Sequence, residues 1–210
     1  VVAFVDVRDE PRDERSWASF IRPQKYVVER FDFGLTNPDD DVAPQSRSIE
    51  SLPLEARSVL EGIAGNGQWG EVDATAAALD LSIQETMNRI QTCVEARVLR
   101  RQIGGYVFVD PYRAKICLSE LDARERGRMH LRIGRFYAQA GPRPMLVQGR
   151  FVAAAHLAAA VSYDALHGQA QTERLPIALA LLDAGRMAMA LTAYDVADGY
   201  LNAAARALDP

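Results

Sequence analysis

A helix that leads directly into two short strands restricts the folds open to this chain. Ser82 precedes an apolar helical period and Glu85 follows it by three residues, a capping box that marks the start of a helix. Residues 98–102 and 106–109 are short β-type runs on either side of a glycine pair. The helix places four apolar residues on one face: Ile83, Met87, Ile90 and Val94.

Two further helices are predicted before this one. Apolar residues recur at helical spacing over 54–63, with Pro53 at the helix start, and an alanine-rich helix follows at 72–79. The glycine-rich run 65–70 lacks the lysine of a phosphate-binding loop, so we interpret it as a turn. Three helices followed by a two-stranded hairpin predict a winged helix, at residues 51–120.

The last ninety residues are predicted to be helical, with helices at 123–140, 152–166, 175–189 and 190–208. Their many alanines favour antiparallel pairs stacked as in solenoid repeats. The last helix is expected to carry one continuous apolar stripe: Tyr194, Ala197, Leu201, Ala204 and Leu208. The predicted fold class is mainly α, a winged helix followed by an α-helical hairpin array, with a short β remnant at the N-terminus.

The first fifty residues carry that β remnant. Residues 1–7 are strand-like and residues 28–33 alternate, whereas residues 34–50 hold three consecutive aspartates and several breakers, typical of a linker. Because the chain opens on a strand without an initiator Met, we interpret it as a fragment of a larger protein. The predicted domains are residues 1–50, a β remnant of an ATPase-core-like segment with its linker; 51–120, the winged helix; and 121–210, a tetratricopeptide-like region.

Composition limits the partners. The 210 residues include 28 acids and 24 Lys or Arg, and the net charge of −4 disfavours nucleic acid as a partner of the whole chain. No apolar run approaches the roughly 20 residues of a membrane-spanning helix, so we expect no membrane partner. Cys93 and Cys117 form no CxxC pair and have no histidine at ligand spacing. We therefore expect two reduced thiols in a cytoplasmic protein, without a metal site.

One block is basic inside this acidic chain. Residues 111–150 hold 9 Lys or Arg and 3 acids. Within it, five arginines lie on one predicted helix: Arg124, Arg126, Arg128, Arg132 and Arg135. They form either a solvated charged face or a docking face for an acidic protein surface, to which arginine is suited because its planar fork pairs with carboxylates. The predicted partner-docking residues are Arg124, Arg128, Arg132 and Arg135.

Several short motifs occur in an order that one family shares. They are Leu52-Pro53-x-Glu55-Ala56, Tyr106-x-Phe108, Asp110-x-x-Arg113, Arg126-x-x-x-His130-x-x-Ile133, and a later run from Ala184-Gly185-Arg186 to Tyr200-Leu201. In this order they resemble the segment that follows the nucleotide-binding core in signal-transduction ATPases with numerous domains. These are large regulators similar to the maltose-regulator and LuxR-type ATPases.

The resemblance implies a winged helix that couples a nucleotide-binding core to a tetratricopeptide-like sensor arm. Val5-x-Val7-Arg8-Asp9-Glu10 resembles the last strand of that core. The family usually has Phe-x-His-Asp where this chain has Phe108-Val109-Asp110, and that histidine is missing here. The chain also lacks a GxxxxGK(S/T) loop. We therefore expect no cofactor in this chain, with ATP or ADP confined to the parent protein.

Catalysis by this chain alone is not expected. Its three histidines, His130, His156 and His167, have no Ser, Cys or carboxylate partners in a recognisable nucleophile arrangement. We interpret His156, within an alanine-rich helix, as a helix-contact residue. No catalytic, cofactor-binding or metal-binding residue is predicted.

Two functions remain open. The first is a regulatory interaction module whose protein partner is its own missing ATPase core or helical arm. The second is a DNA-binding winged-helix transcription regulator with a helical effector or dimerisation domain, which would use Asn88, Arg89, Arg100 and Arg101. The exposed face expected for residues 83–95 carries two acids and one base, which suits phosphate poorly. We therefore favour the interaction module.

Overall fold

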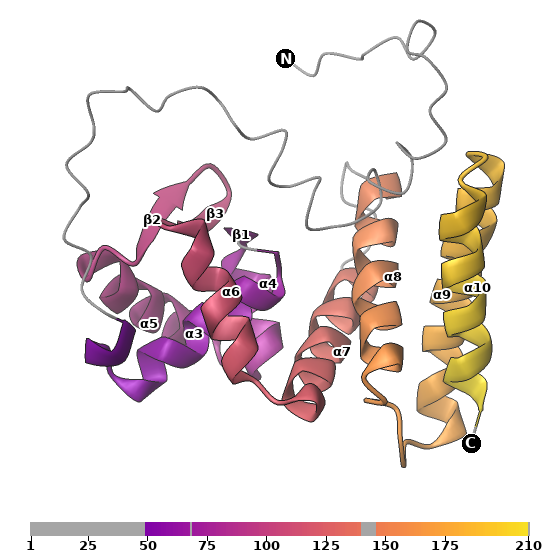
Figure 1. Cartoon of the computed structure of the whole chain (residues 1–210), viewed down its shortest axis with the longest axis horizontal. Coiled ribbons are helices and arrows are strands. Elements are labelled where there is room, and N and C mark those ends of the chain that lie inside the picture. The colour runs from indigo at the N-terminus through magenta and orange to yellow at the C-terminus, as the bar shows by residue number, and fades with distance from the viewer. Residues whose placement is uncertain (1–48, 68, 140–145, 210) are drawn as a thin grey trace, which may run out of the picture.

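The protein is described by a computed structural model, which covers residues 49–67, 69–139 and 146–209 (Figure 1). The predicted β remnant and most of the predicted linker lie outside these residues. The described part is mainly helical, as the sequence predicts, and holds one small sheet of three strands where a two-stranded hairpin was expected. None of its helices is long and apolar enough to cross a membrane.

In the part of the chain that the structure describes, three α-helices precede the hairpin, at the predicted positions. A short 3-10 helix, η1 (Ile49–Ser51), leads into α3 (Leu54–Gly65), α4 (Val72–Leu79) and α5 (Ile83–Glu95). The capping box is formed on one side, since Ser82 Oγ accepts a hydrogen bond from the Glu85 backbone N–H at 3.2 Å. The start of α5 is therefore fixed by a contact within a single turn.

The sheet is antiparallel with the strand order β1-β3-β2. The hairpin consists of β2 (Leu99–Gln102) and β3 (Gly105–Phe108). The interpretation of residues 65–70 as a turn is wrong at its end, because Trp69–Gly70 forms β1 and pairs with Val107 and Tyr106 of β3. A β-carbon on Gly105 would lie 2.5 Å from the Gly70 carbonyl oxygen, so only glycine permits this pairing.

The predicted apolar face of α5 is only half right. Ile90 is fully buried, but Ile83 and Met87 are 53% and 45% exposed. The buried side is instead Thr86, Ile90 and Cys93, which is rotated from the predicted stripe. Thr86 can be buried because its hydroxyl donates to the Ser82 carbonyl at 2.9 Å.

Five helices follow the hairpin within the described residues. The first, α6 (Pro111–Glu120), was not predicted; its N-cap is Asp110, whose side chain accepts a hydrogen bond from the Tyr112 N–H at 3.0 Å. The helix predicted at 152–166 extends too far toward the C-terminus. Residues 163–168 form turns instead, with a positive φ at Asp164 and Gly168. The others are α7 (Ala123–Gln139), α8 (Leu146–Ser162), α9 (Gln171–Ala190) and α10 (Tyr194–Leu208).

These helices pair in sequence order. The pair α7–α8 joins the first half of the molecule to the pair α9–α10, which forms the outer edge on the other side (Figure 1). The continuous stripe predicted on α10 is wrong: Ala197 and Ala204 are buried, whereas Tyr194 and Leu208 are 66% and 45% exposed. The buried side of α10 also includes Tyr200, which stacks on Phe151 of α8 at 6.1 Å between ring centroids.

Candidate functional site

The arginine-rich helix α7 is placed by its own first turn and by its apolar side. The Asp122 side chain accepts from the Glu125 N–H at 2.7 Å and the Glu125 carboxylate accepts from the Asp122 N–H at 3.3 Å, a reciprocal capping box. Met129 and Ile133 are buried on the other side of the helix. Met129 fills the space beside Gly65, where a β-carbon would lie 2.3 Å from its Cε.

The four predicted docking arginines divide into two kinds. Arg132 donates to the Ala78 carbonyl of α4 at 3.2 Å, and Arg135 donates to Gln169 Oε1 at 2.9 Å. These two hold neighbouring elements together. Arg124 and Arg128 are exposed and have no hydrogen bond or ion pair with any residue in the described part of the chain. Only Arg124 and Arg128 thus remain free for a partner.

Arg126, on the same helix, has a structural role. Its guanidinium donates to the carbonyls of Leu118 at 2.5 Å and Leu121 at 3.1 Å, the end of α6. The group also lies over the Tyr163 ring, 5.7 Å from the centroid. A cation at these carbonyls is stabilised by the helix dipole.

A histidine pair lies between α7 and α8. Nδ1 of His130 is 2.9 Å from Nδ1 of His156, which is 6% exposed. Tyr163 stacks on the His130 ring at 6.1 Å, and Tyr137 stacks on His156 at 6.3 Å. The interpretation of His156 as a helix-contact residue is confirmed. Its partner, His130, was not predicted, because the two histidines are 26 residues apart and on different helices.

Both histidines are neutral at neutral pH. Burial, and secondarily the charge of Arg126, lowers the pKa of His130 to about 4. Burial, with a smaller contribution from His130, lowers the pKa of His156 to about 3. One ring therefore donates its Nδ1–H and the other accepts it. A neutral pair of this kind can support packing, and in the described part of the chain neither ring is hydrogen-bonded to a Ser, Thr or Cys side chain.

The residues of the DNA-binding alternative are spread over two elements. Asn88 is exposed on α5, and its amide oxygen accepts from Gln84 at 3.0 Å. The Arg89 side chain is engaged within the molecule, because it forms an ion pair with Glu85 and donates a hydrogen bond to Ser58 Oγ at 3.2 Å. The remaining two, Arg100 and Arg101, are exposed on β2.

The described residues offer little to a metal or a nucleophilic reaction. Among them, no group of three or more His, Cys, Asp or Glu is arranged to hold a metal ion. Both thiols are buried in the core of the first half. Burial raises the pKa of Cys93 to about 12 and that of Cys117 to about 11, so neither is a thiolate at neutral pH.

Comparison of the sequence with protein-family models and with curated proteins, and of the structure with solved structures, finds no match.

Proposed function

We propose that this chain is the regulatory interaction module of a large ATP-dependent signalling or transcriptional regulator. In this proposal the part from α3 to β3 is a winged helix, α7 to α10 form a tetratricopeptide-like arm, and ATP or ADP binds elsewhere in the parent protein. The module relays a change of state between a nucleotide-binding core and the arm by rigid-body motion.

The winged-helix part of the proposal is supported by element order. Helices α3, α4 and α5 precede the β2–β3 hairpin, and β1, between α3 and α4, completes the sheet. Relay of motion is supported by direct contacts between the two halves. Asn66 donates to the Tyr137 hydroxyl at 3.1 Å, and Arg132 reaches the end of α4.

One observation carries the choice of a protein partner over DNA. Arg89 is the only base on α5, and it is engaged by Glu85 and Ser58. The helix that would enter a DNA groove thus offers no unpaired cation, although phosphate contacts supply most of the affinity of DNA-binding proteins. Two exposed cations of α7, Arg124 and Arg128, have no partner in the described part of the chain and fit an acidic protein surface.

A fluorescently labelled poly-L-glutamate peptide serves as a probe of that surface. At low salt we expect the chain to bind it, and the double change Arg124→Glu, Arg128→Glu to weaken binding roughly tenfold, since reversal of two exposed charges costs about 1–2 kcal/mol. The control Asn88→Ala, Arg89→Ala is expected to bind like the wild type. Absence of binding, or equal loss in the control, would contradict α7 as the docking site.

A further inference from the structure

The α9–α10 pair exposes a group of large apolar side chains. Leu175 and Leu179 of α9 are 47% and 52% exposed. Their counterparts Tyr194 and Leu208 of α10 are 66% and 45% exposed. The two helices that carry them, α9 and α10, lie at the edge of the molecule that is remote from α3 to α6 (Figure 1).

The exposed side chains form two stripes with the same spacing. Positions i, i+4, i+7, i+11 and i+14 give Leu175, Leu179, Leu182, Arg186 and Met189 on α9, and Tyr194, Asp198, Leu201, Ala205 and Leu208 on α10. Every member is exposed or half-buried. A spacing of this kind keeps each stripe on one side of its helix. We call the two stripes together the outer face.

Both stripes flank the seam between the two helices and face away from α8. Leu201 packs over Gly185 of α9, where a β-carbon would lie 2.8 Å from Leu201 Cδ2. The residues of α10 that reach α8 lie on another side: Tyr200 stacks on Phe151, and Arg206 donates to the Val161 carbonyl at 3.4 Å. The outer face is therefore one continuous surface built from two antiparallel helices.

Each stripe contains one charge, and the two charges have opposite signs. Arg186 lies four residues before Ala190, the end of α9, and Asp198 lies four residues after Tyr194, the start of α10. Both are thus about one helical turn from the connection, at a similar height. Asp198 accepts from Asn202 at 2.9 Å, but neither charge has an ion-pair partner among the described residues.

We propose that the outer face binds the outer face of a second copy of this chain. Rotation about a twofold axis parallel to the helices places each α9 opposite the partner's α10. This rotation does not shift residues along the helix axis, so Arg186 and Asp198 remain at similar heights. Arg186 then meets Asp198 of the partner subunit, twice per dimer, while the leucines of the two copies cover each other. An isologous contact of this kind is the commonest one in homo-oligomers, and a charge within an apolar seam fixes its register.

Sedimentation equilibrium of the 210-residue chain tests the proposal. We expect the mass to rise from 23.1 kDa toward twice that value with increasing concentration. Arg186→Asp and Asp198→Arg are each expected to weaken dimerisation at least tenfold. An equimolar mixture of these two variants should recover dimers, because their altered faces have opposite charge; so should the double variant that carries both changes.

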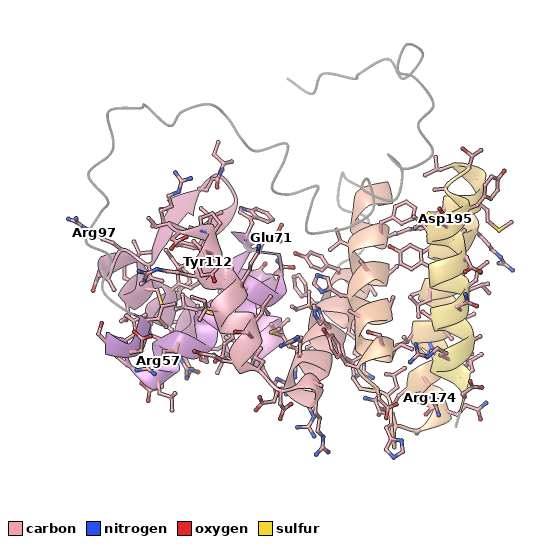
Figure 2. All side chains as sticks on the ribbon, in the orientation of Figure 1. Arg57, Glu71, Arg97, Tyr112, Arg174 and Asp195 are labelled. Carbon is pink, nitrogen blue, oxygen red and sulfur yellow. The ribbon has the colours of Figure 1, made fainter. Side chains whose placement is uncertain are left out.

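The matched control is Asp195→Arg, an exposed acid of α10 that lies off the stripe and is labelled in Figure 2. It is expected to dimerise like the wild type. Circular dichroism confirms that each variant is folded. A chain that stays at 23.1 kDa up to roughly 100 µM, a concentration well above the dissociation constant of a specific complex, overturns the proposal and leaves the outer face to a helix of a different protein. Single charge reversals that leave the dimer unchanged overturn it too.

Discussion

Lowering the pH from 6.5 to about 5 is expected to destabilise the protein steeply, before most carboxylates titrate. The cause is the buried pair of His130 and His156, whose pKa values are lowered to about 4 and about 3. An unfolded histidine has a pKa near 6.5, so in this window the unfolded state binds protons that the folded state excludes.

The sign follows from that difference. A histidine that burial keeps neutral has a lower pKa in the folded state than in the unfolded state, so the unfolded state takes up protons first as the pH falls. The free energy of unfolding therefore decreases as the pH falls. The loss begins near pH 6.5 and ends below the folded pKa. Each pH unit costs at most about 1.4 kcal/mol per histidine, so the decrease between pH 6.5 and pH 5 is on the order of 2 kcal/mol per ring.

Thermal unfolding of variants across this pH range measures the effect. His130→Asn and His156→Asn each keep a polar atom near the position of Nδ1, and each is expected to flatten the pH dependence between 6.5 and 5. His167→Asn is the control, since this histidine has an 84% exposed side chain. If the two buried-site variants keep the wild-type slope, the neutral pair does not set the acid response.

Gly134→Ala is expected to destabilise the protein although alanine is the better helix former. A β-carbon on Gly134 would lie 2.8 Å from Leu157 Cδ2 and 3.1 Å from the Leu157 backbone nitrogen. The Leu157 side chain can change its rotamer, but the backbone of α8 is fixed within the helix. The added methyl group therefore forces α7 and α8 apart. Overpacking of this kind costs about 1–3 kcal/mol, against a gain of up to ~1 kcal/mol in helix propensity.

The same substitution at Gly199 of α10 provides the comparison. Nothing lies within 4 Å of a β-carbon at that position, so Gly199→Ala is expected to raise stability by up to ~1 kcal/mol. Differential scanning calorimetry should therefore show Tm shifts of opposite sign, roughly 2–4 °C per kcal/mol. An unchanged or higher Tm for Gly134→Ala would mean that α7 and α8 are not packed as closely as described.

Local signals in the sequence located α3, α4, α5 and the hairpin. The capping box of Ser82 and Glu85 acts within one turn, so it is legible from sequence alone. The missed helix α6 carried a similar signal, since Asp110 caps it and Pro111 occupies its first position. Strand β1 carried none, because two residues become a strand only through pairing with β3.

Sequence spacing could not predict which arginines of α7 bond to neighbouring elements and which stay exposed. Arg124, Arg128 and Arg132 are equivalent in sequence, yet only Arg132 reaches a carbonyl, at Ala78, 54 positions away. The His130–His156 contact is likewise made by tertiary packing between two helices. Periodicity assigns residues to one side of a helix, whereas these contacts depend on which neighbour packs there.

Titration of a fluorescently labelled library of DNA duplexes with the chain, followed by anisotropy at physiological salt, tests the interaction-module proposal most directly. The engaged Arg89 and the acidic residues of α5 predict no sequence-selective binding, and at low salt only weak binding that falls steeply as salt rises. Tight, sequence-selective binding that is abolished by Asn88→Ala, Arg89→Ala would contradict the proposal and establish the DNA-binding alternative.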